Sequence, residues 1–208
     1  MYRLLAGAGI GTVPSEVATT PEEAVRAAES IGYPVVCKIL SPDILHKSKL
    51  GGVAMDLYSA DQVRVAFSRI LSSVGRARPE ARIEGCLVCG QAPKGLAEII
   101  IGSSVDEEFG PVVMFGVGGE FAEVLRKVEF GSIPVDLEDA TRMVRRVQKT
   151  MGAAQGWGRM NPLVVAGLIH RFSQLASAHP ETESIDLNPV IVYEDRCVVV
   201  DAKGTLCQ

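Results

Sequence analysis

Aromatic residues and long apolar runs are both scarce in this chain. Phenylalanine, tryptophan and tyrosine make up 5% of its 208 residues, with a single tryptophan among them. No stretch approaches the roughly 20 apolar residues that a membrane-spanning helix needs. The N-terminus also lacks a basic segment followed by an apolar run and a cleavage site, so no secretory signal peptide is expected. A net charge of −4 gives no electrostatic case for nucleic acid or an anionic membrane as partner.

Cysteine is sparse as well, with five residues: Cys37, Cys86, Cys89, Cys197 and Cys207. Cys86 and Cys89 have C-x-x-C spacing, but they fall in a predicted strand, where residues three apart face opposite sides. The sequence offers neither a second such pair nor a histidine close by, so we expect no metal centre and no redox dithiol. Our interpretation is buried free thiols in a reducing compartment, taken to be the cytoplasm.

The composition is otherwise that of a globular protein, with 47% apolar and 22% charged residues. Thr20-Pro21-Glu22-Glu23 has the pattern of a capping box with proline at the first helical position. Helices are predicted over residues 1–8, 20–30, 60–77, 136–151 and 161–177, and strands near 34–40, 51–57, 84–91, 97–102, 111–117, 121–128, 184–193 and 196–202. Because helices mix with antiparallel-looking hairpins, we predict an α+β fold of two packed lobes, residues 1–84 and 85–208.

The helix predicted over residues 136–151 has the clearest amphipathic pattern of the second half. Asp136 is expected to cap it. Its buried stripe is predicted to consist of Leu137, Ala140, Val144, Val147 and Met151.

The segment Val35–Val53 carries the first chemical signal. Lys38 lies in a short apolar run predicted to be a strand, where an ammonium group seldom sits without an anionic partner. A polar loop with a histidine and two lysines follows, and Gly51-Gly52 then opens another apolar run. Cationic side chains and a flexible glycine turn beside two strands suit a bound polyphosphate. The spacing is not G-x-x-x-x-G-K-[ST], so a P-loop of that kind is not predicted.

The last predicted hairpin carries the second signal. Asp186 and Asn188 interrupt an apolar strand and, by alternation, share one of its faces. With a turn at residues 193–196, Asp201 is expected roughly opposite Asn188 on the paired strand. Oxygen ligands from one or two side chains, completed by phosphate and water, are how proteins usually hold Mg²⁺. An Asx turn at Asn188-Pro189 with a solvated Asp201 is the alternative.

Taken in order, these segments resemble one family. The run V-C-K-I-L-S-P-D-I-L-H-K-S-K-L-G-G-V, then M-F-G-V-G-G, then D-L-N-P followed by V-D-A is similar to the ATP-grasp domain of NDP-forming acyl-CoA synthetases. These are the ADP-forming acetate–CoA ligases, related more distantly to the succinyl-CoA synthetase β subunit. The resemblance covers nearly the whole chain. It implies a two-lobed ATP-grasp fold with nucleotide between the lobes, and the reaction acyl-CoA + ADP + phosphate ⇌ carboxylic acid + CoA + ATP.

The same resemblance implies which residues bind the nucleotide, ATP or ADP. Lys38 would contact the α- and β-phosphates, and Gly51 and Gly52 would let the backbone approach phosphate. Leu87-Val88-Cys89 would take adenine, mainly through backbone groups. Glu98 would bind the ribose or lie near the metal.

Metal binding and phosphate transfer would fall to other matched residues. Asn188 and Asp201 match the Mg²⁺ ligands of the family. His46 matches a histidine that takes up a phosphoryl group and hands it to the nucleotide. Asp186 and Glu123 match acidic residues near that transfer.

Each assignment has a simpler alternative. A strand lysine that extends to solvent would explain Lys38, and an ordinary loop residue would explain His46. Surface carboxylates would explain Glu98 and Glu123.

The sequence also departs from the family pattern at three places. Cys89 stands where the hinge usually carries Gln or Glu. Gly131 follows Phe130 where an arginine is common. Trp157 interrupts a Gly-Arg-Gly phosphate-loop pattern. Losing an anion-binding arginine would weaken phosphate binding, because charge-assisted hydrogen bonds are the strong ones.

A partner is implied by what the sequence does not contain, namely a CoA-binding Rossmann domain and a second phosphohistidine-bearing domain. The chain is expected to act as a β subunit or domain, inactive without a CoA-binding (ligase-CoA) subunit or domain. One alternative is a non-catalytic ATP/ADP sensor that regulates an associated domain such as an acetyltransferase. A third hypothesis is an ATP-grasp ligase that forms an acyl phosphate directly on this chain.

Overall fold

The computed structural model describes residues 1–208 except 45, 120–126, 153 and 208. It divides into two compact units, each of which is described by itself. The small unit is Val13–Gln91, and the large unit combines Met1–Thr12 with Ala92–Gln208. The small unit is therefore inserted, in sequence, into the large one. Among the described residues, no helix is both long enough and apolar enough to cross a bilayer.

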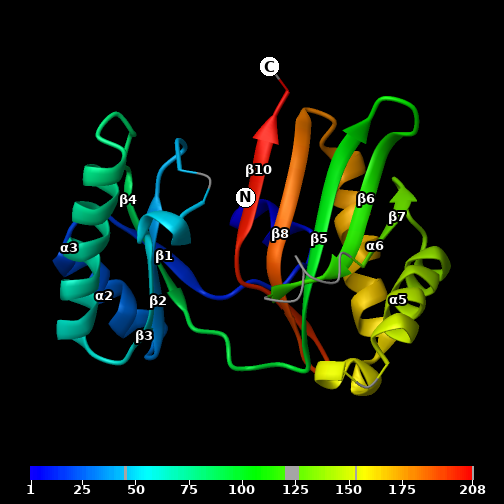
Figure 1. Ribbon diagram of the computed structural model, residues 1–208, viewed down its shortest axis with the longest axis horizontal. Helices are drawn as coiled ribbons and strands as arrows, with labels where there is room; N and C mark the ends of the chain where they lie inside the picture. The colour runs from blue at the N-terminus through cyan, green and yellow to red at the C-terminus, as the bar shows by residue number, and fades with distance from the viewer. Residues whose placement is uncertain (45, 120–126, 153, 208) are drawn as a thin grey trace. The chain divides into compact units, whose positions relative to one another are not determined.

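The small unit is an antiparallel sheet with two helices on one face (Figure 1). Its sheet order is β1-β4-β2-β3. The strands are β1 (Ser15–Ala18), β2 (Val35–Leu40), β3 (Val53–Leu57) and β4 (Gly85–Gly90). The helices are α2 (Pro21–Ile31) and α3 (Ala60–Ala77), and a short 3₁₀ helix, η1 (Ser48–Leu50), precedes β3. The predicted lobe boundary after Glu84 would separate β4 from β1 and β2, the two strands with which it pairs.

Local sequence explains where α2 begins. The Thr20 hydroxyl accepts a hydrogen bond from the Glu23 backbone N–H at 3.2 Å. The Glu23 carboxylate in turn accepts from the backbone N–H of Thr19 at 2.8 Å, so the predicted capping pattern closes one residue earlier than usual. The Thr19 hydroxyl also donates to this carboxylate at 2.7 Å, and this bond, followed by the one from the Thr19 N–H, lowers the pKa of Glu23.

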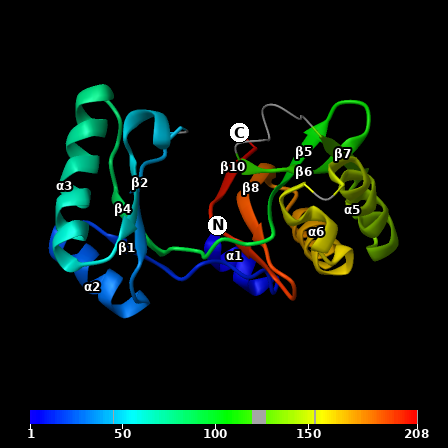
Figure 2. The ribbon, with the colours of Figure 1, turned by 60° about the horizontal axis from the view of Figure 1, so that its bottom comes forward.

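The large unit is a six-stranded antiparallel sheet with α5 and α6 on the same face (Figures 1 and 2). Its order is β10-β8-β5-β6-β7, and β9 pairs with β8 beyond the end of β10. The strands are β5 (Ala97–Asp106), β6 (Gly110–Val117), β7 (Val128–Ser132), β8 (Thr182–Val192), β9 (Cys197–Val199) and β10 (Ala202–Leu206). The helices are α1 (Tyr2–Gly7), α5 (Leu137–Met151) and α6 (Pro162–Ala178), with the 3₁₀ helix η3 at Ala154–Arg159.

In helix α5 the predicted N-cap at Asp136 is confirmed, but the predicted set of buried residues needs correction. The Asp136 carboxylate accepts a hydrogen bond from the Asp139 backbone N–H at 2.7 Å. Leu137 was predicted to be buried, yet it is 48% exposed. It is the first residue of the helix, so no preceding turn of α5 flanks its side chain. Met143, which the stripe omitted, is buried instead at 5% exposure.

Two strand predictions also need correction. The strand predicted over residues 121–128 is found at Val128–Ser132, and residues 120–126 lie outside the described part of the chain. The single strand predicted at 196–202 is divided into β9 and β10. Val200 and Asp201 separate the two pieces without breaking register, since Val199 pairs with Val190 and Ala202 pairs with Leu187.

Ser173 provides a test of the large unit's core. Its buried hydroxyl accepts from the Val135 backbone N–H at 3.0 Å and thereby ties α6 to the segment that leads into α5. Ser173→Ala would leave that N–H without its partner, so the free energy of unfolding should fall by about 1–3 kcal/mol. Urea unfolding followed by fluorescence of Trp157, which is buried in the same core, measures this change. Ser177→Ala, at an exposed position of the same helix, is the matched control and should change stability little. Equal effects of the two substitutions would contradict the assignment.

Candidate nucleotide and metal site

Lys38 occupies the face of the small unit's sheet that turns away from α2 and α3. Its strand neighbours Cys37 and Ile39 belong to the core against the helices, so alternation points Lys38 to the other side. Leu87 on β4 and Val53 on β3 are its cross-strand partners. The residue is only 6% exposed, which argues against the alternative of a lysine that extends freely to solvent. A buried ammonium requires compensating negative charge or hydrogen bonds.

The Gly51-Gly52 pair is required by the turn in which it lies. Gly51 ends η1 in the left-handed region with φ 66°. A Cβ on Gly52 would come within 2.7 Å of the Ile39 side chain, so no larger residue fits there. The Gly52 N–H donates to the Lys47 carbonyl at 2.8 Å, and its carbonyl accepts from Ile39 N–H at 2.7 Å. The pair thus closes the loop after β2, and its expected role in phosphate binding stays a prediction.

The predicted adenine strand is an inner strand. Val88 pairs with Glu16 on one side and with Cys37 on the other, and Cys89 is likewise flanked on both sides. The backbone groups of an inner antiparallel strand are taken up by the ladders. The register therefore leaves little free backbone at Val88 and Cys89 for the expected recognition of adenine.

The thiols next to this strand are inert by their environment. Burial raises the pKa of both Cys37 and Cys86 to about 12, with a smaller contribution from a neighbouring thiol in each case. All five cysteines are free. A thiol that stays protonated is a poor nucleophile and metal ligand, which agrees with the prediction of structural cysteines.

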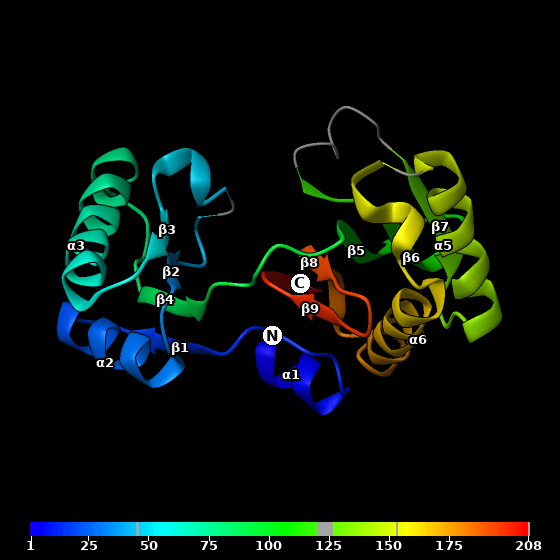
Figure 3. The same cartoon turned by 90° about the horizontal axis from the view of Figure 1, so that it is seen from below.

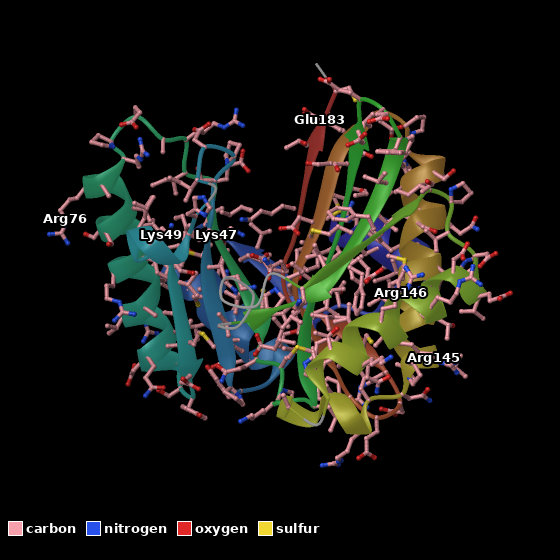
Figure 4. All side chains as sticks on the ribbon, turned by 45° about the vertical axis from the view of Figure 1, so that its right-hand side comes forward. Lys47, Lys49, Arg76, Arg145, Arg146 and Glu183 are labelled. Carbon is pink, nitrogen blue, oxygen red and sulfur yellow. The ribbon has the colours of Figure 1, made fainter. Side chains whose placement is uncertain are left out.

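His46 lies in the loop that leaves β2 and enters η1, and its side chain is exposed. The loop is tied down before it, because the Asp43 carboxylate accepts a hydrogen bond from the Arg82 backbone N–H at 2.7 Å. Figure 4 shows Lys47 and Lys49 on the same segment. His46 is therefore accessible to a phosphoryl donor and has cationic neighbours in sequence, while Leu45 beside it lies outside the described residues.

Asn188 and Asp201 meet as predicted. The Asn188 N–H donates to the Asp201 carbonyl at 3.0 Å, and the Val200 N–H donates to the Pro189 carbonyl at 3.0 Å. The two residues are thus direct cross-strand partners, with their side chains on one face. This pairing favours the metal-site hypothesis over an isolated turn with an unrelated Asp201.

Asp186 extends the same polar row. It pairs with Lys203 on β10 and with Gly102 on β5, where the missing side chain leaves room beside the carboxylate. The pKa of Asp186 is raised, mainly by burial, while the Lys203 ammonium lowers it and the Asp201 charge adds to the rise. Within the described part of the chain, no three His, Cys, Asp or Glu side chains gather into a metal site. A cation here would accordingly be held by few protein ligands, as is usual for Mg²⁺ with bound phosphate.

Two residues that contact this part of the sheet, Tyr2 and Lys203, were not predicted from the sequence. The Tyr2 hydroxyl donates to the Asp201 carboxylate and to the Val200 carbonyl, each at 3.4 Å. Lys203 follows the matched V-D-A segment directly, so its position two residues after Asp201 was a usable signal. Nothing in the sequence pattern connects Tyr2 with residues almost 200 positions later.

Of the remaining predicted carboxylates, Glu98 lies in the described part of the chain. Glu98 is exposed on β5, paired with Ile191, and its carbonyl accepts from the Gly118 N–H at 2.9 Å. Gly119 lies so close that a Cβ there would come within 2.5 Å of the Glu98 carboxylate. Gly118 and Gly119, which follow β6, therefore pack closely against Glu98. Glu123 lies outside the described residues.

The segment that disturbs the phosphate-loop pattern has a structural role in the large unit. Trp157 is 1% exposed and belongs to the core. The Gln148 side chain donates to the carbonyls of Trp157 and Met160 at 2.7 and 3.0 Å. Arg159 is exposed and forms an ion pair with Glu194 at 2.9 Å.

Comparison with known sequences supports the family resemblance. Residues 1–206 match the family described as the ATP-grasp domain. The chain is 39% identical over 200 residues to the β subunit of acetate–CoA ligase (ADP-forming) I from Pyrococcus furiosus, covering 95% of this chain and 86% of that one. It is 42% identical over 200 residues to acetate–CoA ligase (ADP-forming) I from Archaeoglobus fulgidus, covering 95% of this chain but 29% of that longer one.

Solved structures agree with the sequence comparison. A structure of acetyl-coenzyme A synthetase 1 from Ca. Korarchaeum cryptofilum, in complex with coenzyme A and Ca-AMPCP, has a TM-score of 0.92 and 39% identity. The match covers 99% of this chain and 90% of that one. The predicted α+β ATP-grasp fold is confirmed. The chain belongs to the ATP-grasp domain family, in the group that includes the β subunits of ADP-forming acetate–CoA ligases.

Proposed function

We propose that the chain is the nucleotide-binding phosphotransfer module of an ADP-forming acyl-CoA synthetase, working with a CoA-binding subunit or domain. The observation that carries this proposal is the paired Asn188 and Asp201 on one sheet face, with Asp186 beside them. Such a row suits Mg²⁺ that is shared with phosphate oxygens. We further propose the cytoplasm as its compartment, supported by the five free cysteines.

Relatives support the ligands and the partner. The Korarchaeum synthetase has also been solved with coenzyme A and Mg-AMPPCP, with its phosphohistidine segment pointing towards the nucleotide binding site. The Pyrococcus relative is named as one subunit of its enzyme, and this chain spans under a third of the Archaeoglobus relative. We therefore propose ATP or ADP and Mg²⁺ as cofactors, and the CoA-binding part as the site of acyl-phosphate chemistry.

The proposed transfer step runs between His46 and ADP. A β-phosphate oxygen of ADP attacks the phosphorus carried by His46, the P–N bond breaks, and its electron pair returns to the imidazole, which takes a proton from solvent. ATP is the product. Lys38 would neutralise phosphate charge as the bond forms, and Mg²⁺ would supply further charge neutralisation when bound. Asn188 and Asp201 would hold that ion through their side-chain oxygens.

The other matched residues are given supporting roles. Gly51 and Gly52 would shape the loop near the phosphates, and Glu98 would contact the ribose or the metal. Val88 and Cys89 would line the adenine site through side chains and strand position, since their backbone groups are paired. Asp186, together with Glu123 from the part of the chain outside the description, would provide acidic groups near the transfer.

A sensor without catalysis is the second candidate, and one feature favours it. Trp157 is a core residue, and the nearby Arg159 is paired with Glu194. A phosphate-binding arginine of the family pattern is thus replaced by a packing residue in this segment. A sensor would bind ATP or ADP and alter an associated domain, such as an acetyltransferase, without exchanging phosphate.

Lys38 gives the first test. Lys38→Ala removes the ammonium proposed to contact the phosphates, so calorimetry with Mg²⁺-ADP should show a loss of about 1.5–3 kcal/mol in binding free energy. Arg76→Ala, at an exposed position of α3 in the same unit, should leave the affinity nearly unchanged. A folded Lys38→Ala protein with wild-type affinity would remove Lys38 from the site.

The metal pair gives the second test. Asn188→Ala and Asp201→Ala should each raise the Mg²⁺ concentration needed for half-maximal ADP binding, because each removes one oxygen ligand. The double substitution should show a coupling of about 0.5–3 kcal/mol, as for neighbours on one ion. Asp195→Ala, in the turn that joins β8 to β9, is the control. Strict additivity, or nucleotide binding independent of Mg²⁺, would rule the pair out as the ligand set.

His46 separates the two candidate functions. With the CoA-binding partner present, γ-labelled ATP should leave an acid-labile, base-stable label on this chain, as expected for a phosphorylated imidazole. His46→Ala should abolish the label while ADP affinity persists, and Ser48→Ala, at an exposed position close by in the same segment, should keep it. Labelling that survives in His46→Ala would refute the relay. Nucleotide binding without any labelling or exchange in the unaltered protein would favour the sensor.

A further inference from the structure

A surface groove of about 550 Å³ lies between α1 and α6 in the large unit, on residues that the proposed nucleotide site does not use. Figure 3 shows the two helices side by side. On each helix the lining residues come in adjacent pairs that repeat every four positions, so they lie on a single face of that helix. The lining consists of Arg3, Leu4, Gly7, Ala8, His170, Arg171, Gln174, Leu175, Ala178 and His179.

The groove is held between two anchored helices. On the α1 side, Leu5 and Ile10 are buried in the large unit's core at 0% and 2% exposure. The Gly11 carbonyl accepts a hydrogen bond from the Val199 N–H at 2.9 Å and fixes the chain just after α1. On the α6 side, Nδ1 of His170 contacts the Val135 carbonyl at 2.8 Å. The groove is therefore a preformed feature of the fold.

Its charge is opposite to that of the whole chain. The chain carries a net charge of −4, yet the lining contains two guanidinium groups, two imidazoles and no carboxylate. Among the described residues, none forms an ion pair with Arg3 or Arg171. The Glu181 carboxylate contacts Nδ1 of His179 at 2.8 Å. Two exposed, unneutralised guanidinium groups beside apolar residues match a ligand with carboxylates next to an apolar face.

The floor is formed by small and aliphatic residues. Gly7, Ala8 and Ala178 have no side chain or only a methyl group, so they do not fill the groove. Leu4 and Leu175 add apolar surface to its lining. A Cβ placed on Gly7 would meet no atom within 4 Å, so space is open at that point. Low helix surfaces with aliphatic flanks accept the ridge of side chains from another helix.

We propose that this groove docks an amphipathic, acidic helix of the CoA-binding partner. This inference rests on the proposed function for the existence of that partner, and it adds the surface through which the two associate. The helix would place aliphatic side chains against Leu4 and Leu175 and carboxylates against Arg3 and Arg171, in the helix-in-groove mode.

A polypeptide fits the groove better than a small molecule does. Sites for small molecules enclose most of the ligand surface. Here five lining residues, namely Arg3, Gly7, Arg171, Gln174 and Ala178, are exposed, so the groove is open along its length. A second copy of this chain would have to present an acidic helix to the same groove. The first-turn carboxylates Glu138 and Asp139 of α5 already pair with Arg142, and Glu22 of α2 pairs with Arg64. These ion pairs favour a different polypeptide as the occupant.

Binding of the purified CoA-binding partner to this chain, measured by biolayer interferometry, tests the docking surface. Arg3→Glu combined with Arg171→Glu should weaken association at least about tenfold, because close charge pairs across an interface become repulsive. Arg145→Glu combined with Lys149→Glu is the matched control on the exposed face of α5, where Figure 4 labels Arg145, and should change affinity less than about twofold.

A second variant blocks the groove without changing charge. Gly7→Leu adds a side chain where the structure leaves room, so it should also weaken association while α1 remains folded. Gly75→Leu is its control, because Gly75 is another helical glycine whose added Cβ would meet nothing within 4 Å. Equal effects of either test variant and its control would overturn the proposal.

Nucleotide calorimetry on the same proteins separates this inference from the proposed function. The groove variants should bind Mg²⁺-ADP as the unaltered chain does. A chain that binds nucleotide but does not associate with the partner would refute the groove and leave the nucleotide site standing. A dimer of this chain that Gly7→Leu dissociates would identify a second copy as the occupant and also refute it.

Discussion

The antiparallel pairing of β8 with the returning chain is the constraint on which the candidate metal site depends. The turn at Tyr193–Arg196, closed by a 2.8 Å hydrogen bond from the Tyr193 N–H to the Arg196 carbonyl, fixes this register. Once it is fixed, Asn188 must lie opposite Asp201, and Asp186 must lie opposite Lys203. A slip of one residue would turn these polar side chains into the core and the valines outward. The apolar alternation of the two strands therefore specifies the site as strongly as the polar residues themselves.

The small unit holds a buried lysine, Lys38, in an inner strand of its sheet. Lys38 shares β2 with side chains that fill the core against α2 and α3, but it points to the opposite face. The glycine turn that follows is packed so tightly that its geometry is set by Ile39 and Ser73. A cation held on a rigid strand loses little conformational freedom when an anion arrives, which favours binding through preorganisation.

Much of the fold was predictable because local signals and burial agree. The caps at Thr20 and Asp136 both follow from neighbouring residues. The prediction that Leu137 is buried was wrong, because exposure in the first turn of α5 depends on what packs beside it. The periodicity of the sequence does not contain that information. Pairing across the last hairpin was predictable from one turn, whereas the contact of Tyr2 with Asp201 was not, since it joins opposite ends of the chain. The inner position of β4, which limits how Val88 and Cys89 can recognise a nucleotide, depends on strand order and not on strand sequence.

The insertion of the small unit within the large one has a consequence for synthesis on the ribosome. The strands of the small unit pair with one another within residues 13–91, so this part can fold once it has left the exit tunnel. The large unit cannot complete its folding so early, because Thr12 pairs with Val199 near the opposite end of the chain. Closing so long a loop is slow compared with local folding. The first twelve residues must therefore wait, with Leu5 and Ile10 uncovered, until nearly the whole chain has been made.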